Sequence, residues 1–454
     1  MKKTMIGAAA ATAATALVLA GCSTSSEEET TAPTTEASTG ATDEAMTAES
    51  ADITLWLMGG DTNDDLRQYL KDTYAEENGG TLTIEEQGWG DALAKLTTAL
   101  PDSANTPDVT EIGNTWSPTF TAVGAFSDLT DMYDELGGDS LLQSFVEVGK
   151  KDDKNYAMPY YFGSRSIIFR KDIYDAAGVA QPTTLQEFND NAAKLKTDDM
   201  SGFYLGGSDW RNGISWIFAN GGDLAKQEDG QWVSTLSDPN TQKGLKMLQD
   251  LYTSASNAPV GEFDSTPWVN INNNESTGKP EAATIMAPNW AHWSVGLTSE
   301  DENGDVVVGD DGTTPVLTWD DDTFGTFALP GVDGGVAPVF AGGSNIGVSA
   351  SSENQDAAKQ LMTIIFSDEY QTMLAGAGLG PANLDFTSAL GDDQFAKVNI
   401  EAASGSKLTP AAPGWAAVEG SSLLEEFFGK VNAGGDIAAL ATEYDAQITP
   451  MLNG

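Results

Sequence analysis

The most distinctive side chains for chemistry in this chain are its 11 tryptophans. An indole face presents apolar area and a negative quadrupole, whereas one face of a pyranose presents weakly positive C–H bonds. Many of the tryptophans stand beside glycine, proline or amide residues in loops that follow predicted strands: Trp89 in EQGWGD, Trp116 in GNTWSP, Trp210 and Trp216 in GSDWRNGISW, Trp290 and Trp293 in APNWAHW, and Trp415 in APGW. The pattern favours stacking on a sugar ring, although each tryptophan taken singly could instead pack in a core.

Signatures of catalysis are absent from the sequence. The single histidine, His292, leaves no second imidazole for an HExxH zinc site. Neither a GxxxxGK(S/T) phosphate loop nor a GxSxG elbow occurs, and GAGLG at 376–380 follows a predicted helix, whose end it marks. No catalytic residue, metal or cofactor is therefore expected. A glycosidase stays open because it needs only two carboxylates and the chain has 68 acidic residues.

The charge balance argues against polyanionic partners. With 22 basic and 68 acidic residues, the chain has a formal charge of −46. Such a field repels phosphate backbones and anionic head groups. Nucleic-acid binding is therefore not expected, and the charge suits an exported protein that self-repulsion keeps soluble.

Acidic residues at 301–305 raise the question of a calcium site. Asp301, Asn303 and Asp305 have the spacing that begins a calcium-binding loop, but Val306 occupies the glycine position and the later glutamate is missing. The sequence therefore predicts an exposed turn and leaves calcium binding open.

The N-terminus has the features of an export signal. Lys2 and Lys3 precede an uncharged apolar run that is shorter than the ~20 residues needed to span a bilayer. Residues 19–22, LAGC, resemble a bacterial lipobox, in which the chain is cut before the cysteine. We therefore predict a lipoprotein signal peptide over 1–21 and acylation of Cys22, the only cysteine, with palmitate among the acyl groups. An ordinary signal peptide with an incidental cysteine is the alternative.

Residues 22–51 predict a disordered tether, because Ser, Thr, Glu and Ala predominate and few residues could build a core. A flexible chain of this composition would separate the folded body from the lipid. The expected location is the outer face of the bacterial cytoplasmic membrane, with the anchor at Cys22.

Strand and helix patterns alternate from Ile53 onward. ITLWLM is a short apolar run, and DTNDDLRQYLKDTYAEEN after it has a helical pattern. LTIEEQ, DVTEIG and AATIMAP are further strand candidates. Thr184 and Glu187 form a capping box before a helix, and Pro239 begins another. This alternation predicts an α/β fold with parallel-rich sheets flanked by helices.

One long segment carries a family resemblance. YAMPYYFGSRSIIFRKDIYDAAGVAQPTTLQEF at 156–188 is similar to a run in the solute-binding lipoproteins of bacterial ABC sugar importers: a hinge proline, a strand ending in an aromatic, a basic residue and Asp, then a glycine, a proline and a helix. TPDVTEIGN, ANGGD, AATIMAPNW, VFAGGSNIGVSA and DAAKQLMTIIFSDEYQ support it. The resemblance covers essentially all of 52–450.

The resemblance implies a two-lobed periplasmic-binding-protein-like fold, with the ligand in a cleft that hinge bending closes. It places lobe 1 at 52–158 plus 330–378 and lobe 2 at 159–329 plus 379–454, with crossings at Pro159, near 329–330 and near 378–381. The implied function is capture of a sugar, a di- or oligosaccharide being favoured, and delivery to ABC permease subunits without catalysis. A monomer is expected, because no oligomerisation surface is evident.

Positions that match the family's contact loops give the expected ligand-binding residues. Trp290 ranks first because it directly follows a predicted strand, whereas Arg165 could bind two hydroxyls or form a structural ion pair. The set comprises Trp56, Asp61, Asn114, Trp116, Tyr160, Tyr161, Arg165, Trp210, Asn220, Asp223, Asn289, Trp290, Gly343, Ser344, Asn345 and Trp415.

Two other functions remain open at this point. Acid-lined aromatic boxes bind cations as well as sugars, so a polyamine is an alternative ligand. A surface glycosidase or an adhesin is the other alternative.

Overall fold

The computed structural model describes residues 49–263, 266–309 and 312–454. The predicted signal peptide, Cys22 and nearly all of the predicted tether lie outside the described residues. Among the helices of these ranges, none combines the length and the apolarity that crossing a membrane requires.

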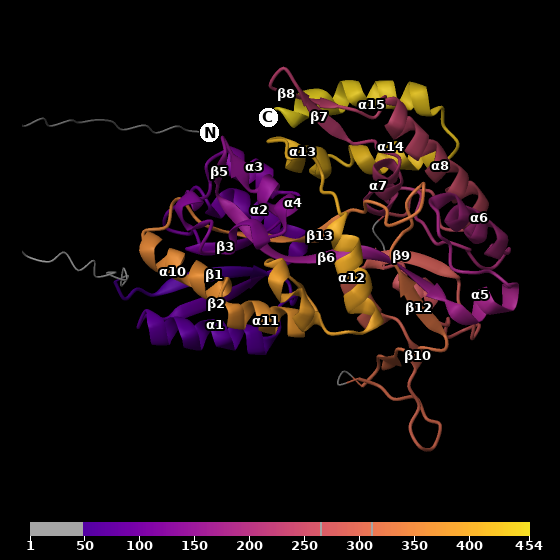
Figure 1. Cartoon of the computed structure of the whole chain (residues 1–454), viewed down its shortest axis with the longest axis horizontal. Helices are drawn as coiled ribbons and strands as arrows, with labels where there is room; N and C mark the ends of the chain where they lie inside the picture. Colours follow the sequence, from indigo (N-terminus) through magenta and orange to yellow (C-terminus); the bar gives the residue numbers. More distant parts are fainter. Residues whose placement is uncertain (1–48, 264–265, 310–311) are drawn as a thin grey trace, which may run out of the picture. The chain divides into compact units, whose positions relative to one another are not determined.

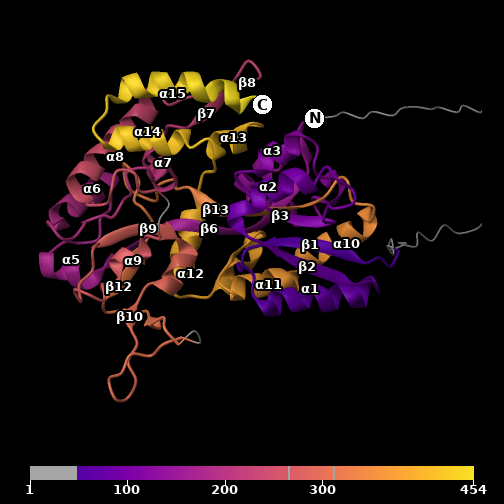
Figure 2. The ribbon, with the colours of Figure 1, turned by 180° about the vertical axis from the view of Figure 1, so that it is seen from behind.

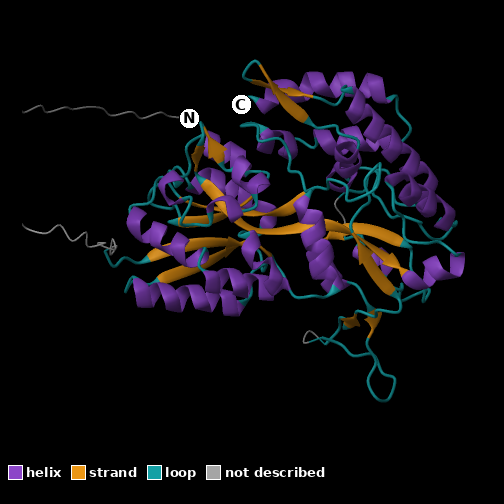
Figure 3. Cartoon of the chain, viewed as in Figure 1, coloured by secondary structure: helices purple, strands orange, loops and turns teal. Residues whose placement is uncertain are grey.

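A mixed sheet of eight strands organises the described chain (Figures 1 and 3). Its path runs β12-β6-β13-β3-β1-β2, and β9 and β14 also pair with β6. The strands are β1 (Ile53–Met58), β2 (Leu82–Gln87), β3 (Val109–Gly113), β6 (Ala157–Arg170), β9 (Thr284–Pro288), β12 (Phe324–Phe327), β13 (Ala341–Val348) and β14 (Gly380–Pro381).

The direction of pairing corrects one expectation. β1 pairs in parallel with β2 and β3, whereas β13 runs antiparallel to β3 and β6, and β9, β12 and β14 run antiparallel to β6. Parallel neighbours need a crossover, usually a helix, and helices supply it between β1, β2 and β3. The remaining pairs, which β9, β12, β13 and β14 make with β3 or β6, are all antiparallel. The sheet is therefore mixed and not parallel-rich.

The helices and the short hairpins surround this sheet. The helices are α1 (Asp64–Glu77), α2 (Trp89–Ala99), α3 (Ser117–Ala122), α4 (Gln143–Val148), α5 (Lys171–Ala177), α6 (Leu185–Leu195), α7 (Trp210–Ala219), α8 (Pro239–Ala255), α9 (Trp268–Ile271), α10 (Gln355–Ile365), α11 (Asp368–Gly376), α12 (Gln394–Ser404), α13 (Trp415–Gly420), α14 (Leu423–Asn432) and α15 (Ile437–Leu452). The two-stranded pairs are β4 (Lys150–Lys151) with β5 (Lys154–Asn155), β7 (Ala225–Glu228) with β8 (Gln231–Ser234), and β10 (Leu297–Thr298) with β11 (Leu317–Thr318).

Two large groups of buried side chains lie at opposite ends of β6. The first core cluster packs β1 and the start of β6 against α1, α10 and α11. The second packs the end of β6 against α6, α7, α8, α13, α14 and α15, and α14 and α15 lie beside α8 in both views (Figures 1 and 2). β6 can contribute to both because its 14 residues are long enough to reach from one cluster into the other.

Several local predictions are confirmed. Thr184 Oγ1 accepts a hydrogen bond from the N–H of Glu187 at 3.2 Å, and the stripe that follows it on α6 is buried. Pro239 is the first residue of α8. The GAGLG segment does mark a helix end, because α11 stops at Gly376.

Residues 301–305 form the expected exposed turn. A carboxylate oxygen of Asp301 accepts the N–H groups of Asn303 and Asp305, at 2.8 and 3.0 Å. Across the described ranges, no group of three or more His, Cys, Asp or Glu side chains is arranged to hold a metal ion.

Candidate functional site

Three alternate residues of β6 define the candidate site. Successive side chains of a strand point to opposite faces, so Tyr161, Gly163 and Arg165 share one face, which we call the β6 face. Tyr161 and Arg165 are 6% and 4% exposed. A Cβ built on Gly163 would have one neighbouring side-chain atom within 4 Å, Cδ1 of Trp290 at 3.9 Å, and the residue paired with it on β13 is another glycine, Gly342. The middle of the β6 face is therefore open.

Two carboxylates meet the hydroxyl of Tyr161. This hydroxyl lies 2.6 Å from Oδ2 of Asp61 and 2.9 Å from Oε1 of Glu111. Asp61, on the loop after β1, is exposed, whereas Glu111 is fully buried in β3. Oε1 of Glu111 also accepts from Ser344 Oγ at 2.6 Å, and its Oε2 accepts the N–H of Met58 at 2.8 Å. Residues from four segments of the chain thus converge on one polar cluster.

Burial controls the ionisation of this cluster. The pKa of Glu111 is raised to about 7, chiefly by desolvation. The hydrogen bonds of Met58 and Ser344 act against this increase, and the charge of Asp61 contributes to it. Burial is also the largest reason why the pKa of Tyr161 lies well above its usual value. Tyr161 therefore stays a neutral phenol, and Glu111 titrates near neutral pH.

Two indoles lie beside Asp61. Trp89 Nε1 donates to Oδ2 of Asp61 at 3.0 Å, and the rings of Trp89 and Trp116 are 5.8 Å apart between centroids. A Cβ on Gly113 would lie 3.4 Å from both rings, so the glycine lets them approach β3 closely. The pair places partly exposed aromatic surface next to a carboxylate, an arrangement that suits a ring with hydroxyl groups.

Arg165 is fixed at the other end of the β6 face. Its Nε donates to Oδ1 of Asn212 at 2.8 Å, and its guanidinium carbon lies 4.7 Å from the ring centroid of Phe340. Nδ2 of Asn212 donates in turn to Asp209 and to the carbonyl group of Met286. Asn212 thus orients the guanidinium of Arg165 through Nε.

Trp290 reaches the open middle of the β6 face from β9. It is the second residue after β9 and the second residue of the 3₁₀ segment Asn289–Ser294, close to the expected position at the end of a strand. Its side chain is 42% exposed, and its ring makes an edge contact with Trp268 at 5.0 Å. Part of the indole is therefore exposed to solvent beside Gly163, which has no side chain.

Three predicted aromatic contacts are corrected to core positions. Tyr160 is fully buried, and its hydroxyl lies 2.6 Å from that of Tyr370. Trp210 and Trp415 are each 1% exposed and pack edge to face, 6.3 Å apart, in the second core cluster. Tyr160 lies at an irregularity of the β6–β13 register, between the paired residues Pro159 and Tyr161, and its ring contacts that of Tyr161 with the centroids 5.2 Å apart.

Trp56 is also placed away from the β6 face. Its Nε1 donates to Glu85 on β2 at 2.8 Å, and its side chain lines a cavity of about 590 Å³ together with residues of α2 and the loop after it. A second cavity, of about 470 Å³, has an apolar lining from α2, α3 and α13. Tyr161, Gly163 and Arg165 line neither cavity.

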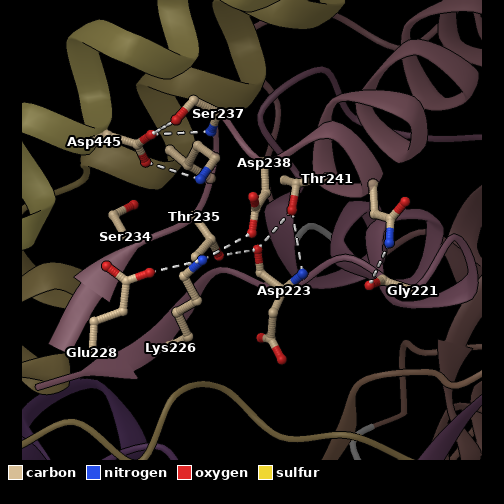
Figure 4. Close-up of polar contacts among 12 residues, drawn as sticks. Gly221, Asp223, Lys226, Glu228, Ser234, Thr235, Ser237, Asp238, Thr241 and Asp445 are labelled. Carbon is tan, nitrogen blue, oxygen red and sulfur yellow. Dashed lines mark hydrogen bonds and ion pairs between the residues drawn. The ribbon is translucent and has the colours of Figure 1, made fainter.

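Asp223 belongs to a polar network around β7 and β8, which Figure 4 shows in close-up. Its carbonyl oxygen accepts from Thr235 Oγ1 at 2.6 Å and from Thr241 Oγ1 at 2.9 Å. Its carboxylate pairs with Lys407 at 2.8 Å. These contacts fix the loop before β7 onto α8, which is a structural role.

The remaining predicted residues mostly serve the backbone. Asn114, Asn220 and Asn345 donate their side-chain N–H groups to backbone carbonyl groups. Asn289 is buried, and its Oδ1 has no hydrogen-bond partner in the structure. Gly343 adopts a φ of +135°, and a Cβ there would lie 2.3 Å from the carbonyl oxygen of Tyr161, so only glycine lets β13 approach β6.

Glu111 and Asn212 are the important residues that sequence reasoning missed. Glu111 stood in DVTEIG as an acidic residue inside a predicted strand, and a buried charge needs partners. An acidic residue at a strand position could therefore have indicated a polar cluster in the sequence. Asn212 gave none, because its role depends on Arg165, 47 residues away in the chain.

Comparison with known proteins decides the family. Residues 59–372 match the family model described as bacterial extracellular solute-binding protein. The chain belongs to this family. The curated relative DasA of Streptomyces coelicolor, named a diacetylchitobiose binding protein, is 31% identical to this solute-binding protein over 371 residues, which is 81% of each chain. The resemblance drawn from the sequence is confirmed at this level.

Solved structures confirm the fold of this solute-binding protein. The sugar-binding protein MalE from Xanthomonas citri superposes with a TM-score of 0.72 at 18% identity and covers 88% of this chain and 97% of its own. A cyclic α-maltosyl-1,6-maltose binding protein from Arthrobacter globiformis gives a TM-score of 0.68 at 17% identity, covering 88% and 99%. Both share the mixed α/β architecture with its curled sheet.

Proposed function

We propose that this solute-binding protein captures an uncharged di- or oligosaccharide at the β6 face and delivers it to an ABC permease. Membership of an extracellular solute-binding family supports the role in capture. The relative at 31% identity carries the name of a disaccharide-binding protein, which supports the ligand class.

The observation that carries the proposal is the open position at Gly163. It lies between the Asp61–Tyr161 cluster and Arg165, and a partly exposed indole stands 3.9 Å away. A carboxylate accepts hydrogen bonds from sugar hydroxyl groups, an indole stacks on the apolar face of the ring, and few such polar groups suffice to orient a ligand. Asp61, Tyr161, Arg165, Trp116, Trp290 and Ser344 remain in the proposed site, and Trp89 joins them.

Capture would operate by closure of two lobes around the ligand. The two core clusters at opposite ends of β6 support the predicted division of the chain. Ala337, Val339 and Phe340 pack in the second cluster, so we move the second predicted crossing from 329–330 to the residues that follow 340. A ligand that touches both lobes only when they are closed shifts the population towards the closed form.

Titration calorimetry with a panel of saccharides tests the ligand class. Diacetylchitobiose and maltose are the first probes, and spermidine is the competitor that represents a cationic ligand. Stoichiometric binding of a saccharide that spermidine does not displace is expected. Preferential binding of spermidine would instead favour a polyamine binder, and release of reducing ends from an oligosaccharide would indicate a glycosidase.

Trp290→Ala should weaken saccharide binding by about tenfold or more, because it removes a stacking platform worth about 1.4 kcal/mol or more. Calorimetry with the best saccharide of the panel measures the effect. Trp232→Ala is the matched control, since this partly buried tryptophan of β8 packs against the second core cluster. Equal affinities of the Trp290→Ala variant and the unmodified protein would remove Trp290 from the site.

We also propose that Cys22 anchors the protein in the membrane. Metabolic labelling with palmitate should mark the unmodified chain, and Cys22→Ala should abolish the label and release the protein into the medium, because the acyl chains supply the membrane affinity. A Cys22→Ala chain that still carries palmitate would contradict the assignment.

A further inference from the structure

The hydroxyl of Tyr161 has one hydrogen to donate and two carboxylate oxygens close enough to accept it. A phenol carries one hydrogen, yet two carboxylates lie within hydrogen-bond distance of it, Asp61 at 2.6 Å and Glu111 at 2.9 Å. If both carboxylates were ionised, one of these two contacts would bring together two oxygens with no hydrogen between them. One additional proton resolves the conflict.

The hydrogen-bond pattern shows where this proton fits. Oε2 of Glu111 must keep a lone pair for the N–H of Met58. Oε1 can carry the proton, donate it to the Tyr161 oxygen and still accept the hydrogen of Ser344 Oγ. Tyr161 then donates its own hydrogen to Asp61, which is the shorter of its two contacts. This arrangement satisfies all three side chains, and it places the neutral carboxyl at the buried Glu111 and the charged one at the exposed Asp61.

The surroundings of Glu111 also favour its neutral form. Its hydrogen-bond partners, the backbone N–H of Met58 and the hydroxyl groups of Tyr161 and Ser344, carry no positive charge. Their hydrogen bonds lower the pKa of Glu111, but burial outweighs them. The charged group that faces it is Asp61, whose negative charge and the burial of Glu111 raise the pKa of Glu111 in the same direction.

The other titratable groups nearby do not offset this effect. Tyr160 and Tyr370 face Glu111 from β6 and α11, and their pKa values are raised chiefly by burial, so both are neutral. The positive charge of Arg67 on α1 acts on Tyr160 and Tyr370. Its guanidinium donates to Thr62, to the carbonyl oxygen of Gly59 and to Glu86.

We propose that Glu111 is a positioning residue: it holds a proton at neutral pH and, through Tyr161, fixes Asp61 in the orientation that binds the ligand. This proposal rests on the proposed function. When Glu111 loses the proton, Tyr161 divides its single hydrogen between two carboxylates that also repel each other, and Asp61 is no longer fixed. Ligand affinity should therefore fall as the pH rises through neutrality.

The unliganded protein tests the position of the proton directly. The chain is labelled with ¹³C at the carboxyl carbons of glutamate, and the resonance that Glu111→Gln removes is followed with pH by NMR. A midpoint near the value of about 7 is expected. Asp61→Asn should lower this midpoint, because it removes the neighbouring negative charge. A Glu111 midpoint below about 5 would overturn the proposal.

Ligand binding supplies the second test, with diacetylchitobiose as the probe. Its affinity for the unmodified protein should fall by about threefold to tenfold between about pH 6 and about pH 9. Glu111→Gln should bind with an affinity that does not change with pH and lies near the unmodified value at the acidic end, because the amide can donate to Tyr161 at every pH. Glu135→Gln, at an exposed position with the same change of charge, should follow the unmodified protein.

Two outcomes would separate the possible failures. If Glu111→Gln keeps the full pH dependence of the unmodified protein, the positioning role is wrong even though saccharide binding is intact. If diacetylchitobiose binds at no pH, the ligand of the proposed function is wrong, and the NMR midpoint still decides whether Glu111 holds its proton. Should Glu111→Gln fail to fold, Tyr161→Phe breaks the same connection and should likewise abolish the pH dependence.

Discussion

Replacing Gly163 with leucine should reduce saccharide affinity by about a hundredfold or more while leaving the fold intact. The first added carbon would meet one side-chain atom at an ordinary contact distance, 3.9 Å from Trp290, so the substitution needs no shift of the backbone. The rest of the leucine side chain would occupy the open middle of the β6 face. A sugar ring could then no longer lie between Tyr161 and Arg165. Calorimetry with the best saccharide of the panel measures the loss, and thermal unfolding checks the fold.

Gly261→Leu is the matched control for this prediction. Gly261 lies in an exposed turn, and a Cβ on it would have no neighbour within 4 Å. The same increase in volume at this position should leave saccharide affinity unchanged. A Gly163→Leu protein that binds as tightly as the Gly261→Leu control would show that the ligand does not use the β6 face.

Glu111→Gln should change the pH dependence of stability by about 3 kcal/mol. The pKa of Glu111 rises from its ordinary value of 4.5 to about 7 in the folded protein, mainly through desolvation. Below about pH 4.5, folded and unfolded chains both hold the proton. As the pH rises from about 4.5 to about 7, the unfolded chain releases it first, so the contribution of Glu111 to stability is lost over this window.

Glutamine does not titrate, so the variant should escape this loss. Urea unfolding of both proteins at a series of pH values gives the difference in their free energies of unfolding. This difference should move in favour of Glu111→Gln by about 3 kcal/mol between about pH 4.5 and about pH 8. The same difference for the exposed control Glu135→Gln should stay near zero. A flat difference for Glu111→Gln would mean that Glu111 is ionised in the folded protein.

The local elements could be predicted because their patterns depend on near neighbours. The alternation in ITLWLM gives a strand with Ile53, Leu55 and Leu57 buried, as it should for a period of two. The α6 stripe follows the helical period, and its cap lies within three residues of the groups that it binds. The same reasoning placed Trp290 just beyond a strand, and it is the second residue after β9.

Sheet direction could not be predicted in the same way. Pairing of β13 with β3 and β6 depends on where residues more than a hundred positions apart meet. The alternation of strands and helices predicts crossovers only between neighbouring elements, and it was correct for β1, β2 and β3 alone.

The sequence by itself determined the α/β class and the resemblance to solute-binding proteins. Composition, periodicity and the long segment at 156–188 depend only on the order of the residues along the chain. The tertiary structure decided which of the aromatic and acidic residues can serve a ligand. Tyr160 and Tyr161 both pack in the first core cluster, yet the hydroxyl of Tyr160 meets Tyr370 whereas that of Tyr161 meets Asp61 and Glu111. Burial and the distance between side chains depend on how remote segments pack, so the proton shared around Tyr161 had no counterpart in any stretch of sequence.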